Sequence, residues 1–311
     1  MRIAVTGASG FIGRYLVPIL LAEGHEVIGI SSQAGGLPKD GLRWLKADLL
    51  DEAQCQQAMA AAKADCLVHL AWYAVHGKFW TASENFAWSR ATANLLAGFS
   101  QVGGQRVVAA GTCAEYDWSY GYCVEDRTPI APATLYGKCK DATRQFAQDY
   151  CRSNDLEFVW GRIFTPYGPG EPEGRLLPSV LRAMTLGETV KCSHGRQFRD
   201  FLQVGDVASA FAHLATGTRE TGVFNVSSGE PLRLADLVAM CARLFETVPA
   251  IEFGAVPVSD FDPMILVGCS EKLARTGWKA RVPIHDGLAD YREKYVDLMR
   301  VKNGSSKTVR A

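Results

Sequence analysis

Two residues with complementary acid–base chemistry, Tyr136 and Lys140, stand four positions apart in the chain. On an α-helix this spacing places both side chains on one face. An ammonium group beside a phenol favours the phenolate, so we expect Lys140 to lower the pKa of Tyr136 until the phenol exchanges a proton near neutral pH. Thr112 supplies a hydroxyl that can bond to the same substrate oxygen. Together the three groups are predicted to stabilise charge on an oxygen while a hydride moves at the adjacent carbon.

A glycine-rich turn at the start of the chain is the second feature that indicates chemistry. The apolar run over residues 1–5 predicts a buried strand, and the apolar density over residues 14–22 predicts a helix. Gly7 permits a tight turn between them, Gly10 lets the backbone approach a pyrophosphate, and Gly13 lets the helix pack close to the strand. Such glycines also serve purely structural turns, but the flanking strand and helix favour dinucleotide binding.

Apolar runs and helical stretches alternate through the first half of the chain, which predicts a mainly parallel sheet covered on both faces. The predicted strands are residues 1–5, 26–30, 41–50, 65–71, 105–111 and 156–164, and the predicted helices are 14–22, 52–63, 83–100 and 134–152. In doubly wound sheets, ligands bind at the carboxyl ends of the strands. The predicted fold class is α/β: a Rossmann-type doubly wound, mainly parallel sheet with a smaller α/β C-terminal substrate lobe.

The composition changes after Phe164. Residues 165–174 are rich in proline and glycine and cannot form a helix interior, so we place a domain boundary there. The predicted units are a dinucleotide-binding domain over residues 1–165 and a substrate-binding lobe over 166–301, some segments of which pack back on the first domain. A basic loop is expected around residues 197–200. The polar residues 302–311 predict a frayed, flexible tail.

The end of the second predicted strand bears on the choice of dinucleotide. An NAD site of this type usually places an Asp or Glu there to hold the ribose 2′-hydroxyl, whereas this chain has Ser31 and Ser32. Small hydroxyls, with Arg14, Lys39 and Arg43 nearby in sequence, leave room for a 2′-phosphate. NADP is therefore the preferred cofactor and NAD the alternative, although the serines can also simply end a strand.

An unusual aromatic stretch, residues 72–80, follows the fourth predicted strand. It holds Trp72, Tyr73, Phe79 and Trp80 together with His76 and a lysine. Two interpretations stay open. The aromatics either clasp the next helix as packing residues, or form a wall of the substrate pocket, where aromatic rings stack on a sugar or base.

Composition excludes several classes of protein. The chain has 311 residues, 48% of them hydrophobic, with 33 basic and 33 acidic residues and a formal charge of zero. Neither a nucleic-acid surface nor a membrane surface is indicated. We expect no bilayer-spanning run, no secretory signal and a cytoplasmic location. Nine cysteines without metal-ligand spacing are interpreted as reduced packing thiols, and no metal site is predicted.

Eight short stretches give the chain a specific likeness, and they follow one another in the family's order over nearly its whole length. They are residues 6–13, 47–49, 69–71, 112–116, 136–140, 167–170, 199–201 and 206–208. The chain resembles the extended short-chain dehydrogenase/reductase family, in its NAD(P)-dependent nucleotide-sugar epimerase/dehydratase/reductase branch. The resemblance implies that Tyr136 is the proton donor or acceptor, that Lys140 holds the ribose, and that Thr112 polarises the substrate oxygen.

The resemblance also implies binding residues and a partner. The cofactor-binding set is Gly7, Gly10, Phe11, Ile12, Gly13, Arg14, Ser31, Ser32, Asp48, Leu49, Leu70, Ala71, Tyr136 and Lys140. The substrate-binding set is His76, Thr112, Cys113, Arg175 and Arg199. The implied substrate is a nucleotide-diphosphate sugar, whose phosphates suit the bidentate chemistry of Arg199 and Arg175, although Arg175 is equally a solvated loop charge. A homodimer through the helices 83–100 and 135–152 is implied as well.

The subfamily depends on the residues that follow Thr112. Dehydratases of this family carry carboxylates at the next two positions, where this chain has Cys113 and Ala114. Glu115 comes one residue later and, by strand alternation, should point elsewhere. A plain hydride transfer needs no second acid–base pair, so the chain is predicted to be a reductase of a nucleotide-linked 4-keto, often 6-deoxy, sugar.

Two other functions stay open. The runner-up is an NAD-dependent nucleotide-sugar epimerase that retains its cofactor, in which Cys113 could transfer a proton, although a packing thiol is the preferred interpretation. The third is a dinucleotide-binding redox sensor without catalysis. Such proteins typically lose the tyrosine or the lysine, whereas Tyr136 and Lys140 are both present here.

Overall fold

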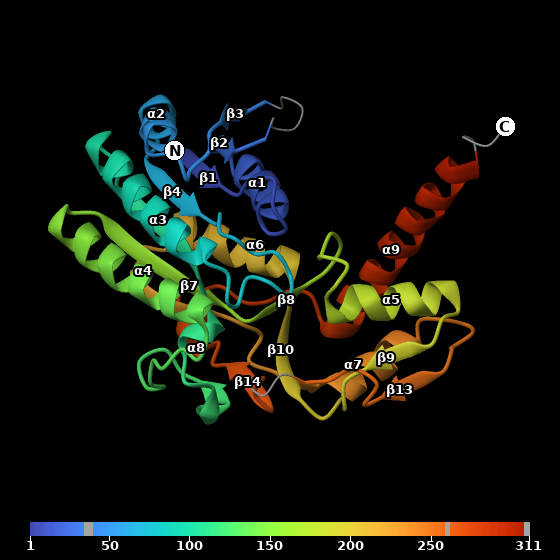
Figure 1. Cartoon of the computed structure of the whole chain (residues 1–311). Coiled ribbons are helices and arrows are strands. Elements are labelled where there is room, and N and C mark those ends of the chain that lie inside the picture. The colour runs from blue at the N-terminus through green and yellow to red at the C-terminus, as the bar shows by residue number, and fades with distance from the viewer. Residues whose placement is uncertain (34–39, 259–261, 308–311) are drawn as a thin grey trace.

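A seven-stranded, fully parallel sheet forms the centre of the computed structural model, which describes residues 1–33, 40–258 and 262–307 (Figure 1). Across the sheet the strands follow the order β11 (Gly222–Val226), β7 (Glu157–Ile163), β5 (Arg106–Thr112), β4 (Cys66–His69), β1 (Arg2–Thr6), β2 (Glu26–Ser31) and β3 (Leu42–Lys46). The order reverses between β1 and β4, so a crevice opens at the carboxyl ends of these two strands.

Helices cover both faces of this sheet, as the alternating apolar runs predict. On one face α1 (Gly13–Ala22) packs beside α6 (Val204–Ala212). On the other face lie α2 (Glu52–Ala62), α3 (Glu84–Gln101) and α4 (Leu135–Ser153). The strands are buried on both sides, and successive residues of β1, such as Ile3 and Ala4, belong to the apolar cores of opposite faces.

The second lobe is a smaller α/β unit. Its main sheet has the order β12 (Pro231–Arg233), β10 (Phe198–Gln203), β14 (Ile265–Gly268) and β6 (Tyr122–Cys123), and β8 (Thr165–Tyr167) also pairs with β10. A two-stranded sheet joins β9 (Val190–Cys192) to β13 (Ile251–Phe253). The helices are α5 (Leu176–Leu186), α7 (Leu234–Ala242), α8 (Glu271–Arg275) and α9 (Ile284–Lys307). Residues of α5, α7 and α9 share one apolar core.

The predicted fold class is confirmed, and three details of the sequence analysis are corrected. Residues 198–203 form strand β10, not a basic loop, because they pair with β8, β12 and β14. Residues 42–46 alone form the third strand. The last helix continues to Lys307, whereas a frayed tail was expected from residue 302; residues 308–311 lie outside the described part.

Segments cross between the two lobes. Strand β11 lies in the main sheet although it follows residue 165, and β6 pairs with β14 of the smaller sheet although it precedes that residue. We therefore propose the division at residue 165 as an outline in which α6 and β11 belong to the first domain. None of the helices in the described ranges is long and apolar enough to cross a bilayer.

Candidate active site

The turn between β1 and α1 has the close backbone contacts that its glycines predict. Gly7 has a φ of +67°, and its carbonyl accepts a hydrogen bond from Gly10 N at 2.9 Å. A Cβ on Gly13 would stand 2.2 Å from Gly7 O, so only glycine lets the helix approach this closely. Ile12, which precedes the helix, makes no side-chain cap. The N–H groups of Arg14 and Tyr15 bond to Gly10 O at 3.1 Å and to Ile12 O at 3.0 Å, so an anion would be met by the N–H groups of the turn that precede them. These features fit a dinucleotide pyrophosphate.

A buried polar chain holds the neighbouring strand end in place. His69 lies between two threonine hydroxyls, with Nδ1 at 2.7 Å from Thr6 Oγ1 and Nε2 at 3.0 Å from Thr92 Oγ1. Thr6 Oγ1 also accepts the backbone N–H of Ala71 at 3.3 Å. Burial, together with the positive charge of Lys140, lowers the pKa of His69 to about 3, so the ring is neutral. The chain therefore fixes the end of β4 beside the glycine turn without adding charge.

The residues expected to bind the adenosine half of the dinucleotide are only partly placed to do so. Ser31 Oγ lies 3.4 Å from Ser9 Oγ, and Ser32 is exposed beside it. Arg43 instead donates to Ala61 O at 2.8 Å, so it is turned away toward α2, and Lys39 lies outside the described residues. Arg14 donates to Gly10 O at 3.2 Å. Of the two described cations considered for a 2′-phosphate, Arg43 therefore gives it no support here.

The remaining predicted dinucleotide positions lie at the same edge of the sheet. Asp48 follows β3, is exposed, and accepts a hydrogen bond from Leu50 N at 3.0 Å. Leu49 is buried, whereas Phe11, Ile12, Leu70 and Ala71 are partly exposed around the turn. Phe11, Ile12, Leu70 and Ala71 thus lie by the carboxyl ends of β1 and β4, where a dinucleotide would bind in this fold, whereas Leu49 belongs to the apolar core after β3.

Thr112 and Tyr136 meet at the carboxyl end of β5. The Thr112 hydroxyl accepts the N–H of Ala114 at 3.2 Å. The Thr112 side chain also lies close enough to the Tyr136 phenol to oppose part of the rise in the pKa of that phenol. Tyr136 lies in the first turn of α4, which Thr134 caps by accepting the N–H of Gly137 at 3.1 Å. The two predicted catalytic hydroxyls are therefore adjacent, as one substrate oxygen would require.

The prediction that Lys140 lowers the pKa of Tyr136 is wrong. Burial raises the pKa of Tyr136, and the nearby Cys113 and Glu115 add to that effect. Lys140 Nζ donates instead to Ala110 O at 2.8 Å and lies 3.7 Å from the centre of the Trp72 ring. The spacing predicted the shared helix face correctly, but not that the ammonium would turn into the sheet edge and leave burial to dominate.

The pKa of Lys140 lies far below that of an exposed lysine. It is 4% exposed, and burial lowers its pKa to about 7, an effect that the negative charge of Glu115 partly opposes. A buried lysine with an ordinary structural role would be better replaced by an apolar side chain, because desolvating an ammonium is unfavourable. A buried ammonium with a strongly lowered pKa at the end of β5 makes Lys140 a candidate for a role in binding or chemistry.

Replacing Lys140 with methionine is expected to separate function from stability. The thioether fills a similar volume without a charge to desolvate, so the melting temperature should hold or rise. Turnover should fall by at least roughly a hundredfold. Thermal melts and steady-state rates measure both, with Lys138→Met as a control on the exposed face of the same helix. A large fall in melting temperature would contradict a functional role for the ammonium.

The aromatic stretch 72–80 clasps the next helix, and two of its rings also contact Tyr136. Trp72 covers Lys140, and its Nε1 donates to Asn85 Oδ1 of α3 at 2.8 Å, so it also clasps the next helix. Phe79 and Trp80 stand edge-on to the Tyr136 ring, with ring centroids 4.9 Å and 5.8 Å away. These rings enclose the phenol, and Trp80 is partly open to solvent. The stretch thus lies beside the hydroxyl of Tyr136 that the sequence predicts to be catalytic.

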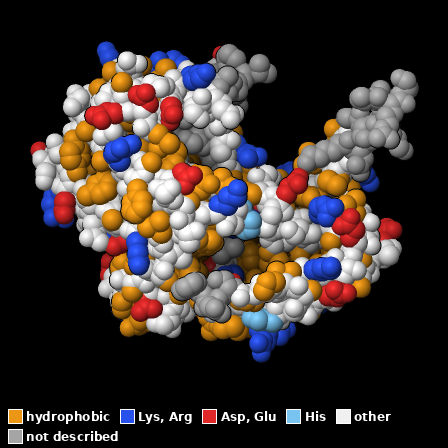
Figure 2. All heavy atoms as spheres, viewed as in Figure 1, with side chains coloured by type: hydrophobic (Ala, Val, Ile, Leu, Met, Phe, Trp, Pro, Cys, Tyr) orange, Lys and Arg blue, Asp and Glu red, His pale blue; other side chains and the backbone are white. Residues whose placement is uncertain are grey.

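His76 and Arg175 come together across the opening. The His76 ring packs against Gly174, and burial and the charge of Arg175 lower its pKa. Arg175 precedes α5 and pairs with Glu171 at 3.2 Å, so it is not the free loop charge that the sequence allowed. Figure 2 shows this side of the molecule hollowed between the two lobes, with apolar and basic side chains around the hollow.

Arg199 and Cys113 have defined environments. Arg199 lies on β10, is 9% exposed, and pairs with Asp262 at 2.6 Å. Cys113 is buried in an apolar cluster with Tyr116, Phe164 and Leu266, and burial raises its pKa to about 12. The thiol is therefore protonated at neutral pH, which favours the packing interpretation over proton transfer.

The sequence did not predict the positions of two residues that contact the candidate site, Trp72 and Glu115. Trp72 was noted only as one aromatic among several, although it directly follows Ala71 at the end of β4. Glu115 was expected to point elsewhere, and it does: it is fully buried, with Arg162 Nε at 2.6 Å. Its position three residues after Thr112 was the available signal, because this spacing lets a side chain reach back to the backbone of the first residue.

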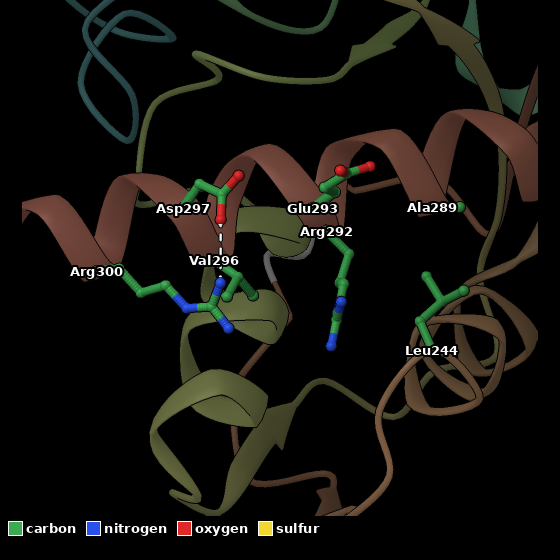
Figure 3. Close-up of a pocket in the computed structure, with 7 residues that line it drawn as sticks. All are labelled: Leu244, Ala289, Arg292, Glu293, Val296, Asp297 and Arg300. Carbon is green, nitrogen blue, oxygen red and sulfur yellow. Dashed lines mark hydrogen bonds and ion pairs between the residues drawn. The ribbon is translucent and has the colours of Figure 1, made fainter.

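A pocket beside α9 lies away from the candidate site and has a different lining. It is lined by Leu244, Ala289, Arg292, Glu293, Val296, Asp297 and Arg300 (Figure 3). Arg300 turns to Asp297, with which it pairs at 3.3 Å, and Arg292 points into the pocket and lies 5.1 Å from the Phe245 ring centre. This lining holds paired charges and aliphatic groups, so we place the chemistry at the main sheet.

All nine cysteines are free and buried, in keeping with packing thiols. Within the described ranges no group of His, Cys, Asp or Glu side chains is arranged to hold a metal ion.

Comparison with known proteins supports the dinucleotide site. The family model described as the NAD dependent epimerase/dehydratase family matches residues 3–227. The dTDP-6-deoxy-L-talose 4-dehydrogenase (NAD(+)) of Aggregatibacter actinomycetemcomitans is 26% identical over 273 residues, which cover 86% of this chain and 99% of that protein.

Solved structures share the whole fold. The UDP-glucose 4-epimerase of Thermus thermophilus, in complex with NAD, has a TM-score of 0.84 at 25% identity and covers 95% of this chain and 99% of its own. MoeE5, in complex with UDP-glucuronic acid and NAD, has a TM-score of 0.83 at 28% identity and covers 97% of this chain and 100% of its own. The similarity thus extends over both lobes.

Proposed function

Because the chain belongs to the NAD-dependent epimerase/dehydratase family, we propose that it is an NADP(H)-dependent reductase of a nucleotide-linked 4-keto, often 6-deoxy, sugar. One observation carries the proposal. Thr112 ends β5 and Tyr136 lies in the first turn of α4 close beside it, while the two positions after Thr112 hold Cys113 and Ala114. The next carboxylate, Glu115, is turned into the core. This arrangement has what hydride transfer needs and lacks the adjacent carboxylates that water elimination would use.

Each residue of the site has its own role in the proposed reaction. The bound dinucleotide supplies the hydride. Tyr136 holds the keto oxygen and delivers its proton, and the raised pKa of its phenol keeps that proton in place until the reaction requires it. The Thr112 hydroxyl bonds to the same oxygen and stabilises charge that develops there. Lys140 would hold the ribose, from its place at Ala110 O beside the strand end.

The two arginines would hold the diphosphate of the nucleotide sugar. Arg175 and Arg199 each pair with a carboxylate, Glu171 and Asp262, and each pair lies in the second lobe or at its edge. Planar guanidinium groups suit phosphate oxygens because they bind them in a bidentate manner. His76 and Cys113 would line the sugar. We also propose a homodimer through α3 and α4, on which Phe86 is 62% exposed.

NADP is proposed over NAD because Ser31 ends β2 where a carboxylate would exclude a 2′-phosphate. Replacing Ser31 with aspartate should shift the preference toward NADH by more than about tenfold, since the new carboxylate holds a 2′-hydroxyl and repels a 2′-phosphate. Rates with NADPH and NADH measure the ratio, with Ser9→Ala as the control for the lost Ser31–Ser9 contact. An unchanged ratio in the aspartate variant would contradict this assignment.

The alternative is an epimerase that keeps its cofactor, as the likeness to the UDP-glucose 4-epimerase of Thermus thermophilus suggests. Cofactor handling separates the two functions. Stoichiometric NADPH oxidation in the presence of 4-keto sugar nucleotides supports the reductase. Purification with tightly retained NAD⁺, and interconversion of sugars without net cofactor turnover, would instead establish the epimerase.

A further inference from the structure

A buried carboxylate lies directly beneath the proposed catalytic threonine and takes no part in proton transfer. Glu115 is 0% exposed. Its Oε1 accepts the backbone N–H of Thr112 at 2.8 Å and the indole N–H of Trp160 at 2.9 Å. Its Oε2 accepts Arg162 Nε at 2.6 Å. Both oxygens are thus engaged inside the protein, and neither is available to a substrate.

These contacts fix the last residues of β5 from below. Lys140 Nζ binds Ala110 O, two residues before Thr112, while Glu115 binds Thr112 N. Between them Gly111 has no side chain, and a Cβ there would stand 2.1 Å from Trp160 Nε1. Glycine therefore lets the indole N–H reach Glu115. The carboxylate and the ammonium hold adjoining parts of one strand end, which places the Thr112 hydroxyl.

Glu115 and Lys140 also interact through their charges. Glu115 is the acidic group whose field favours the charged form of Lys140, against the burial that lowers the pKa of the lysine. The other groups that face the ammonium are the Trp72 ring, at 3.7 Å from Nζ, and the Trp160 ring, at 5.7 Å. His69 is neutral, as its low pKa requires. In the part of the chain that the structure describes, Glu115 is thus the carboxylate whose charge acts on Lys140.

Resting on the function proposed above, we propose that Glu115 is a positioning residue for the reaction: it anchors the backbone of Thr112 and supplies the negative charge that keeps Lys140 in its ammonium form. Arg162 balances the carboxylate on its other side, and its guanidinium lies 4.3 Å from the Tyr116 ring centre. The two effects can be separated. Anchoring Thr112 needs a carboxylate on a side chain of this length, whereas the effect on Lys140 needs only the negative charge.

Glu115→Gln tests the charge. The ammonium form of a lysine is lost as pH rises through its pKa, and removing Glu115 lowers that pKa further. The pH at which NADPH binding weakens should therefore move down by roughly one unit. Fluorescence titrations of NADPH between pH 6 and pH 9 measure this without turnover. They report on Glu115 even if the protein does not reduce a 4-keto sugar, which separates failure of this inference from failure of the proposed function.

Glu115→Asp tests the anchor. The shorter side chain keeps the charge but withdraws its oxygens from Thr112, so the pH dependence of NADPH binding should stay close to that of the wild type while kcat falls by at least about tenfold. Glu125→Gln is the matched control, because Glu125 is also buried but accepts the N–H of Asn225 at 2.8 Å instead. It should change neither kcat nor the pH dependence.

Each outcome decides the proposal. A folded Glu115→Gln variant with an unshifted pH dependence would overturn the charge role, and wild-type kcat in Glu115→Asp would overturn the anchor. If Glu115→Gln does not fold, which thermal melts reveal, Glu115→Asp alone decides. Loss of the fold in both, with Glu125→Gln folded, would assign Glu115 to stability only and overturn the proposal as a whole.

Discussion

Replacing Tyr136 with phenylalanine is expected to lower turnover by roughly a hundred- to ten-thousand-fold, the range that a positioned general acid contributes. Only the phenolic oxygen is lost. The ring keeps its edge-on contacts with Phe79 and Trp80, so the fold and the dinucleotide site should be preserved. Steady-state rates and NADPH titrations on the same preparation measure the two properties separately.

Tyr150→Phe is the matched control for this change, because Tyr150 lies on the same helix, α4, where it packs against the apolar core. It should retain wild-type turnover. A protein that binds dinucleotide only as a redox sensor would be indifferent to both substitutions. Equal behaviour of Tyr136→Phe and wild type, in binding and in any catalysed reaction, would therefore remove the enzymatic account and favour the sensor.

Replacing Gly13 with alanine should produce the second large effect, on dinucleotide binding. The new Cβ would stand 2.2 Å from Gly7 O and 2.7 Å from Ala8 Cα, and both are backbone atoms that cannot swing aside. The turn must open, which should cost about 1–3 kcal/mol of stability. Because the same turn forms the pyrophosphate site, NADPH affinity should fall by more than about tenfold, or about 1.4 kcal/mol.

Gly24→Ala controls for a general loss of stability. Gly24 follows the other end of α1, has a φ of +81°, and has open space where a Cβ would stand, so alanine there strains only the backbone. We expect it to lower the melting temperature without weakening NADPH binding. Comparable losses of NADPH affinity in both variants would show that the Gly13 effect is not specific to the turn.

The sequence predicted the parts of the fold that depend on local pattern. Long apolar strands such as 105–111 and amphipathic helices such as 134–152 fall within one or two residues of β5 and α4. The short strands of the second lobe were missed. Strands of two to four residues, such as β6 and β14, carry too little pattern to identify, and they exist because a distant segment pairs with them.

In the candidate site, too, the sequence predicted the local features but not the distant contacts. The spacing of Tyr136 and Lys140 predicted their shared helix face, but it could not predict which atom Lys140 Nζ would meet. That atom is Ala110 O, and the Trp72 ring covers the ammonium. Burial then governs the pKa of Tyr136, in the direction opposite to the one expected from the lysine charge. The depth of a side chain is a property of tertiary packing, which a spacing in sequence does not contain.

The most direct test follows the hydride itself. The protein is incubated with NADPH carrying deuterium at the transferable position of C4 and with a 4-keto-6-deoxy sugar nucleotide, and the product is analysed by mass spectrometry and NMR. We predict one deuterium at C4 of the sugar for each NADPH oxidised. No NADPH oxidation and no deuterium in the sugar would contradict the reductase, and interconversion of a sugar nucleotide with its C4 epimer by protein that retains NAD⁺ would establish the epimerase in its place.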